Sequence, residues 1–190
     1  MHDADRYRMA VSFATEKHLG QYRIGGLPYI THPLAVAQLL REQGFDISYQ
    51  IAGLFHDLLE DTDAAVEEIT AIGGPDVTEA VRRLTKTEGY VMADYIQKIK
   101  ENPIAVAVKA ADRLHNLRCA VEAGPEFRYQ YILESMDWYL DFSAEIPTAV
   151  RDLISTLDEP TQSRIAQQRP AVFRQLMHLS VSQSQKGLNI

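Results

Sequence analysis

Four ionisable side chains stand close together in an otherwise apolar stretch of the chain. They are His56 and Asp57, followed by Glu60 and Asp61, in the segment AGLFHDLLEDT. Charged groups within an apolar helix are costly unless an opposite charge lies among them, and a divalent metal would supply it. Residues three and four positions apart share a helical face, so this turn presents two metal ligands and two further carboxylates to one point. The alternative is that these residues form an exposed acidic end of a helix and bind no metal, but carboxylates at the C-terminal end of a helix are opposed by the helix macrodipole.

Two further candidate ligands stand far from this turn in the sequence. His32 lies in the segment PYITHP, just before a helix that Pro33 is expected to begin. Asp112 lies in the segment VKAADRLHNL and shares a helical face with Asn116. The full candidate set is His32, His56, Asp57 and Asp112. Two imidazoles with two carboxylates suit manganese, iron, zinc, cobalt or nickel, and we expect one such divalent ion, with manganese favoured.

These segments together resemble the HD superfamily of metal-dependent phosphohydrolases, whose signature is a histidine, then an HD pair, then an aspartate. The fuller pattern has an arginine ahead of PYxxHP, then HDxxED, then KxADRxxNL. It resembles the (p)ppGpp hydrolase domain of Rel/SpoT proteins and the stand-alone small alarmone hydrolases, over residues 3–145. The resemblance implies an all-α HD-domain helical bundle that removes the 3′-pyrophosphate of (p)ppGpp.

The resemblance also implies a role for each matching residue. The four candidate ligands would hold the metal, while Glu60 and Asp61 would activate water and transfer its proton. Arg23 matches an arginine that contacts the nucleotide, and Asn116 matches an asparagine beside the substrate. Further candidates for phosphate contact are Lys86 and Lys109. Tyr29 is interpreted as a packing residue, and no role is assigned to His18 and His115.

Two positions depart from the alarmone pattern, and both concern substrate recognition. Ile24 stands where a lysine is common, and Cys119 stands where a small hydroxyl residue often contacts the nucleotide. These departures leave open an HD phosphohydrolase of another nucleotide, such as a nucleoside monophosphate or a phosphorylated dinucleotide cofactor. A regulatory module that binds metal or nucleotide without catalysing a reaction is an alternative of a different class. Such a module would not need the two carboxylates beyond the metal ligands, Glu60 and Asp61. A cyclic-dinucleotide phosphodiesterase would need a further GYP-type block, which the sequence lacks.

Length and composition set the remaining expectations. A chain of 190 residues suits one domain with a short appendage. Its net charge of −7 argues against a nucleic-acid surface, so we expect a small-molecule nucleotide as partner. One cysteine permits no internal disulfide and no Cys-rich zinc site. No run reaches the about 20 apolar residues of a membrane span, so we expect no membrane contact and a cytoplasmic location. A homo-oligomer is left open.

Hydrophobic periodicity and capping signals predict helices throughout and no convincing strand. The expected helices run over about 3–20, 33–44, 46–59, 62–73, 76–87, 92–101, 103–124, 126–143, 148–157 and 171–179. The helix over 46–59 is nearly all apolar before His56, so it should be the buried central helix. We expect an HD phosphohydrolase domain over 1–145, a C-terminal helical appendage over 146–180 and a disordered tail over 181–190.

Overall fold

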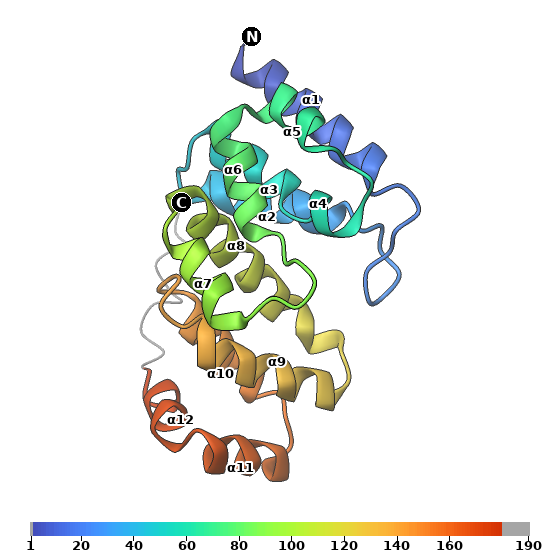
Figure 1. The fold of residues 1–190 in the computed structure, drawn as a ribbon. Helices are drawn as coiled ribbons and strands as arrows, with labels where there is room; N and C mark the ends of the chain where they lie inside the picture. The colour runs from blue at the N-terminus through green and yellow to red at the C-terminus, as the bar shows by residue number, and fades with distance from the viewer. Residues whose placement is uncertain (1, 180–190) are drawn as a thin grey trace, which may run out of the picture. The chain divides into compact units, whose positions relative to one another are not determined.

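A computed structural model describes residues 2–179, and the regular structure in this part of the chain is helical (Figure 1). The one departure is an isolated antiparallel bridge between Tyr22 and Pro28. The predicted all-α class is therefore confirmed. The tail predicted to be disordered, 181–190, lies outside the described residues. No helix among those described is long and apolar enough to cross a membrane.

The helices fall into two compact units, one ending at Asn116 and the other beginning at Leu117, so that the division lies within α8. The helices up to that point are α1 Asp3–Lys17, α2 Thr31–Glu42, α3 Ile47–Phe55, α4 Leu58–Asp61, α5 Val66–Gly73, α6 Pro75–Leu84, α7 Met92–Lys100 and α8 Pro103–Cys119. After them come η1 Ala120–Glu122, α9 Pro125–Trp138, α10 Ile146–Ile154, α11 Glu159–Gln168 and α12 Pro170–Met177.

Helix α3 is the buried centre of the first unit, as its apolar sequence predicted. It begins where the Asp46 carboxylate accepts the amide of Ser48 at 2.8 Å, which satisfies a donor that the helix start leaves unpaired. Its apolar residues Ile51, Leu54 and Phe55 are fully buried, and it packs against α1, α2, α5 and α6. The site residues that follow α3 are therefore held by a rigid apolar helix.

The single helix predicted over 46–59 is wrong, because the structure breaks it in two. Helix α3 ends at Phe55, α4 begins at Leu58, and His56 with Asp57 form the turn between them. The His56 Nδ1 atom lies 2.8 Å from the carbonyl oxygen of Gly53. In a continuous helix that carbonyl would accept the amide of Asp57, so the histidine ring competes with the backbone for it.

Other helix boundaries also differ from the sequence prediction, for local reasons. Helix α5 begins at Val66 rather than near residue 62, because the Thr62 hydroxyl donates to the Leu58 carbonyl and closes α4. Helix α11 was missed, since no helix was predicted between residues 157 and 171. The Asp158 carboxylate in fact accepts the amide of Thr161 at 3.0 Å and caps this helix.

The second unit is built around α9, which packs on α10 and α11, while α12 packs on α10 and α11. Arg169, just before α12, forms a two-pronged ion pair with Asp137 of α9, at 2.6 and 2.7 Å. Arg128 of α9 donates to the carbonyl of Thr156 at 3.1 Å. The expected boundary at residue 145 falls inside this unit, between α9 and α10, and that division into domain and appendage stays a prediction.

A stability prediction follows from the close contact between α2 and α3. A methyl group at Gly53 would lie 2.8 Å from Leu40 Cδ1 and 3.4 Å from the Cα of Ala37. We expect overpacking in Gly53→Ala to lower the free energy of unfolding by about 1–3 kcal/mol. The higher helix propensity of alanine offsets about 1 kcal/mol of this loss. Urea denaturation measures the change. In a Leu40→Ala background the closest of these contacts is removed, so an equal cost there would contradict this account.

Candidate metal centre

Two separate segments of the first unit bring two histidines and an aspartate together. His32 lies in the first turn of α2, and His56 and Asp57 lie in the turn after α3. Their ligand atoms all fall within 4.8 Å of one another. Asp57 Oδ2 lies 2.9 Å from His56 Nε2 and 3.8 Å from His32 Nε2. The two imidazoles are buried and the carboxylate is partly exposed, so the cluster is reached from solvent on the side of Asp57.

The prediction that His32 precedes its helix is wrong, because α2 already begins at Thr31. Pro33 is tolerated in this first turn since the amides there have no partner within the helix.

Asp112, from α8, meets the same two histidines. Its Oδ1 atom lies 3.2 Å from His32 Nε2 and 3.8 Å from His56 Nε2. The other oxygen, Oδ2, accepts a hydrogen bond from the Lys109 ammonium at 2.8 Å. The aspartate is buried, so this pairing orients it and leaves Oδ1 directed at the histidines. All four sequence candidates are thus brought to one place.

The ring of His56 is oriented by the backbone. Because a carbonyl only accepts, the 2.8 Å contact with Gly53 requires a proton on His56 Nδ1. His56 Nε2 is fully buried and has no hydrogen-bond partner, although Asp57 Oδ2 is near it. An unpaired buried nitrogen is costly unless something binds it. The donor set therefore fits a divalent cation, with the backbone bond fixing the ring as in many metal sites.

His115 orients the second histidine, a contact that the sequence interpretation missed. The Nδ1 atoms of His115 and His32 lie 2.8 Å apart. One must donate and the other accept, and a donor at His32 Nδ1 leaves His32 Nε2 free to face the cluster. The available signal was the spacing, because His115 stands one helical turn after Asp112 in α8.

Tyr29 also does more than pack beneath the loop, which corrects its interpretation as a packing residue. Its hydroxyl donates to Asp57 Oδ2 at 2.7 Å and lies 3.4 Å from Asp61 Oδ2. Burial, and the Asp57 carboxylate beside it, raise the pKa of this phenol, so the hydroxyl stays protonated and keeps donating. Tyr29 thereby connects a candidate metal ligand to a candidate proton acceptor.

The charges of the cluster support one another. Burial alone would lower the pKa of His56, but the Asp57 carboxylate outweighs it and raises that pKa to about 9. Burial likewise works against the Asp57 and Asp112 carboxylates, yet His56 and Lys109 respectively hold the pKa of each well below its ordinary value. Both carboxylates are therefore ionised at neutral pH. The two ionised carboxylates favour a cation in the cluster, and a metal bound at His56 Nε2 would replace the proton that this raised pKa places on the imidazole.

The two candidate acid–base carboxylates lie on α4 and have different partners. Glu60 is exposed, and its Oε2 atom accepts the backbone amide of Lys86 at 2.9 Å. Asp61 is linked to Asp57 through Tyr29. Partial burial and the neighbouring Asp57 charge raise the pKa of Asp61. Glu60 is thus bonded to the loop after α6, whereas Asp61 lies beside Tyr29.

The candidate substrate residues are only partly brought together. Arg23 donates to the Asn116 carbonyl oxygen at 2.8 Å, and the Asn116 amide donates to Asp112 Oδ1 at 2.6 Å. This chain links the loop before α2 to the metal cluster. Lys109 is already engaged by Asp112, so it supplies charge to the cluster. The Lys86 ammonium lies 5.3 Å from the Tyr90 ring centre, and no contact of it with Arg23 or Asn116 is described among residues 2–179.

The matches with known proteins fit this site. A family model described as an HD domain matches residues 10–146, so the chain belongs to the HD-domain family. A probable guanosine-3′,5′-bis(diphosphate) 3′-pyrophosphohydrolase of Synechocystis is 36% identical over 139 residues, which are 67% of this chain and 18% of that protein. The bifunctional (p)ppGpp synthase/hydrolase SpoT of Escherichia coli K12 is 32% identical over 145 residues, 70% of this chain and 21% of that protein.

A solved structure gives the same result. It is described as a metazoan ortholog of SpoT that hydrolyzes ppGpp, and it matches with a TM-score of 0.60 and 26% identity. The match covers 86% of this chain and 95% of the other. The curated relatives are longer proteins, of which this chain spans about a fifth. The family resemblance predicted from the sequence is therefore confirmed.

Proposed function

We propose that the protein is a metal-dependent phosphohydrolase that removes the 3′-pyrophosphate of (p)ppGpp, giving GDP or GTP and pyrophosphate. The observation that carries the proposal is the buried His56 Nε2 atom, which faces two carboxylates and a second histidine without a hydrogen bond. The HD-domain family, and relatives named for (p)ppGpp hydrolysis, support the choice of reaction. An intact acidic pair beside the cluster favours turnover over a module that only binds.

Four residues would hold the metal in this proposal, namely His32, His56, Asp57 and Asp112. The bound ion would polarise the phosphoryl oxygens and lower the pKa of a water. We favour manganese because half of the donor set is carboxylate oxygen, which suits harder ions. Lys109 would position Asp112 and Tyr29 would position Asp57, since each donates a hydrogen bond to an oxygen of that aspartate.

Glu60 and Asp61 would manage the proton in this proposal. Glu60 is exposed, so its carboxylate is available to take a proton from an attacking water. The Lys86 amide holds it in place at 2.9 Å. Asp61, whose pKa is raised, is suited to return a proton to the leaving oxygen. No serine or cysteine nucleophile is required.

Arg23 and Asn116 would hold the nucleotide. A guanidinium presents five donors, and the one hydrogen bond described for the Arg23 guanidinium among residues 2–179 is to the Asn116 oxygen. The remaining donors suit phosphate oxygens or a base edge. Lys86 and Lys109 would add positive charge to the surroundings of the phosphates.

The deciding experiment is an assay of the manganese-loaded protein against phosphorylated nucleotides including ppGpp, with pyrophosphate and orthophosphate measured separately. We expect ppGpp to release pyrophosphate. Arg23→Ala should raise KM for ppGpp by about 10-fold or more, because a hydrogen bond to a charged group contributes about 1.5–3 kcal/mol. Arg41→Ala removes a charge from an exposed position of α2 and is the matched control. An unchanged KM for Arg23→Ala would remove this residue from substrate binding.

A second candidate function is supported by the two departures from the alarmone pattern. Ile24 is 70% exposed on the same loop as Arg23, where a lysine would add a charge beside the nucleotide. A pocket without that charge favours a less phosphorylated substrate, such as a nucleoside monophosphate. In that case the same assay would show faster cleavage of another nucleotide, with orthophosphate as the product.

A further inference from the structure

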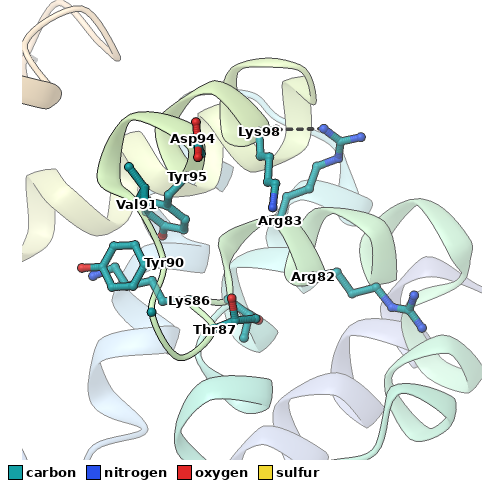
Figure 2. Close-up of a pocket in the computed structure, with 11 residues that line it drawn as sticks. Arg82, Arg83, Lys86, Thr87, Tyr90, Val91, Asp94, Tyr95 and Lys98 are labelled. Carbon is teal, nitrogen blue, oxygen red and sulfur yellow. Dashed lines mark hydrogen bonds between the residues drawn. The ribbon is translucent and has the colours of Figure 1, made fainter.

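A cavity of about 280 Å³ lies between the end of α6 and the start of α7, separate in its lining from the residues of the metal cluster (Figure 2). Its cationic lining residues are Arg82, Arg83, Lys86 and Lys98. One carboxylate, from Asp94, also lines it. Arg83 is paired with Glu79 and Glu101, which leaves three cations against the Asp94 carboxylate, in a chain whose net charge is −7. Such a surface attracts anions.

Arg83 is fixed by its neighbours, whereas Arg82 and Lys98 are not. In Figure 2 the Arg82 guanidinium points away from Lys98, so it must turn inward to share a ligand with it. Arg83 is held by Glu79 at 2.7 Å and by Glu101 at 2.9 Å, and it also donates to the backbone carbonyl of Lys98. These bonds tie α6 to α7. Within residues 2–179, neither Arg82 nor Lys98 takes part in an ion pair, and both side chains are exposed. In Figure 2 the Lys98 ammonium extends from α7 toward α6.

The other side of the cavity is aromatic. The Lys86 ammonium lies 5.3 Å from the ring centre of Tyr90 and 5.6 Å from that of Tyr95, so it is held along this wall. Thr87 adds a hydroxyl to the lining. The volume of about 280 Å³ lies just below the about 300–1,000 Å³ typical of small-molecule sites. The cavity therefore suits a small, highly charged ligand better than a dinucleotide.

We propose that this cavity is a second anion site, which binds a diphosphate group through Arg82, Lys98 and Thr87. The ligand is either free pyrophosphate or the diphosphate of a nucleotide, because both present the same oxygens. Lys86 links this site to the candidate base, since its side chain lines the cavity while its amide donates to Glu60 at 2.9 Å. Occupancy would thus restrain the segment that holds Glu60. The site does not depend on the proposed turnover.

The first test measures binding to the full chain by calorimetry, with EDTA present so that the metal centre does not capture the anion. Pyrophosphate and GDP are titrated in parallel at fixed ionic strength. Arg82→Gln combined with Lys98→Gln should weaken binding by about 10-fold or more. Arg41→Gln combined with Lys100→Gln removes the same charge elsewhere and should leave the affinity unchanged. Equal losses in both double variants, or no binding by the wild type, would overturn the proposal.

A comparison variant separates this site from the metal centre. Arg23→Gln alters the candidate nucleotide contact and should not change pyrophosphate affinity in EDTA. Loss in Arg23→Gln, with none in the cavity variant, would assign the anion to the metal centre and reject the second site. Tighter binding of GDP than of pyrophosphate would identify a nucleotide diphosphate as the ligand, and the reverse order would identify the free anion.

The second test needs no substitution and uses the protein as purified. Lysine acetylation is followed by mass spectrometry with and without pyrophosphate. Lys98 lines the cavity, whereas Lys100, two residues later on α7, does not. We expect pyrophosphate to slow acetylation of Lys98 at least several-fold while Lys100 reacts at the same rate. Equal protection of both lysines, or of neither, would contradict a specific site. Failure here would leave the metal-dependent hydrolysis untouched, because that reaction is measured separately.

Discussion

His56→Ala is expected to abolish metal retention, whereas the wild-type protein should retain about one divalent ion per chain. The substitution removes a buried ring whose Nδ1 atom is held by the Gly53 carbonyl and whose Nε2 atom lies 2.9 Å from Asp57 Oδ2. Asp57→Ala should have the same effect, because its Oδ2 atom faces both histidines. Metal content by inductively coupled plasma mass spectrometry after dialysis measures the loss. Activity should disappear with the metal.

The control is His178→Ala, which removes a histidine outside the cluster, at the end of α12. It should retain metal at the wild-type level. Circular dichroism must show that the His56→Ala chain is folded, and His32→Gln provides a second ligand variant with a similar shape. Full metal occupancy in the folded ligand variants would reject the centre described above.

Glu60→Gln is expected to reduce turnover by about 100-fold or more, because an amide cannot accept the proton of the attacking water. The glutamine oxygen can still accept the Lys86 amide, so the local structure and the metal content should be preserved. Steady-state kinetics on the fastest nucleotide of the panel measures the loss, with metal content determined on the same sample. The exposed Glu67→Gln on α5 is the matched control and should keep wild-type turnover.

Asp61→Asn gives the comparison that assigns the two carboxylates. If turnover falls much further in Asp61→Asn than in Glu60→Gln, the base is Asp61 and not Glu60. The Tyr29 contact makes this outcome structurally reasonable, since it joins Asp61 to the Asp57 ligand. Unchanged turnover in both variants would exclude the acidic pair from proton transfer.

The sequence alone determined the all-α class, the central buried helix and the family. These follow from local signals, because apolar periodicity and capping residues such as Asp46 act within a few positions of the chain. It also selected the four residues that the structure brings together at the cluster. That selection was possible because the HD pair and the acidic pair stand three and four positions apart, which places their side chains on one helical face where a metal can bind.

Only the tertiary structure decided what each of these residues touches. Tyr29 meets Asp57 across 28 positions, and His32 meets His115 across 83 positions, so no local pattern could have predicted either contact. The break after Phe55 arises because a histidine side chain competes for a backbone carbonyl, which periodicity does not encode. The cationic cavity likewise exists only because α6 and α7 pack together and place lysines and arginines from separate helices around one space.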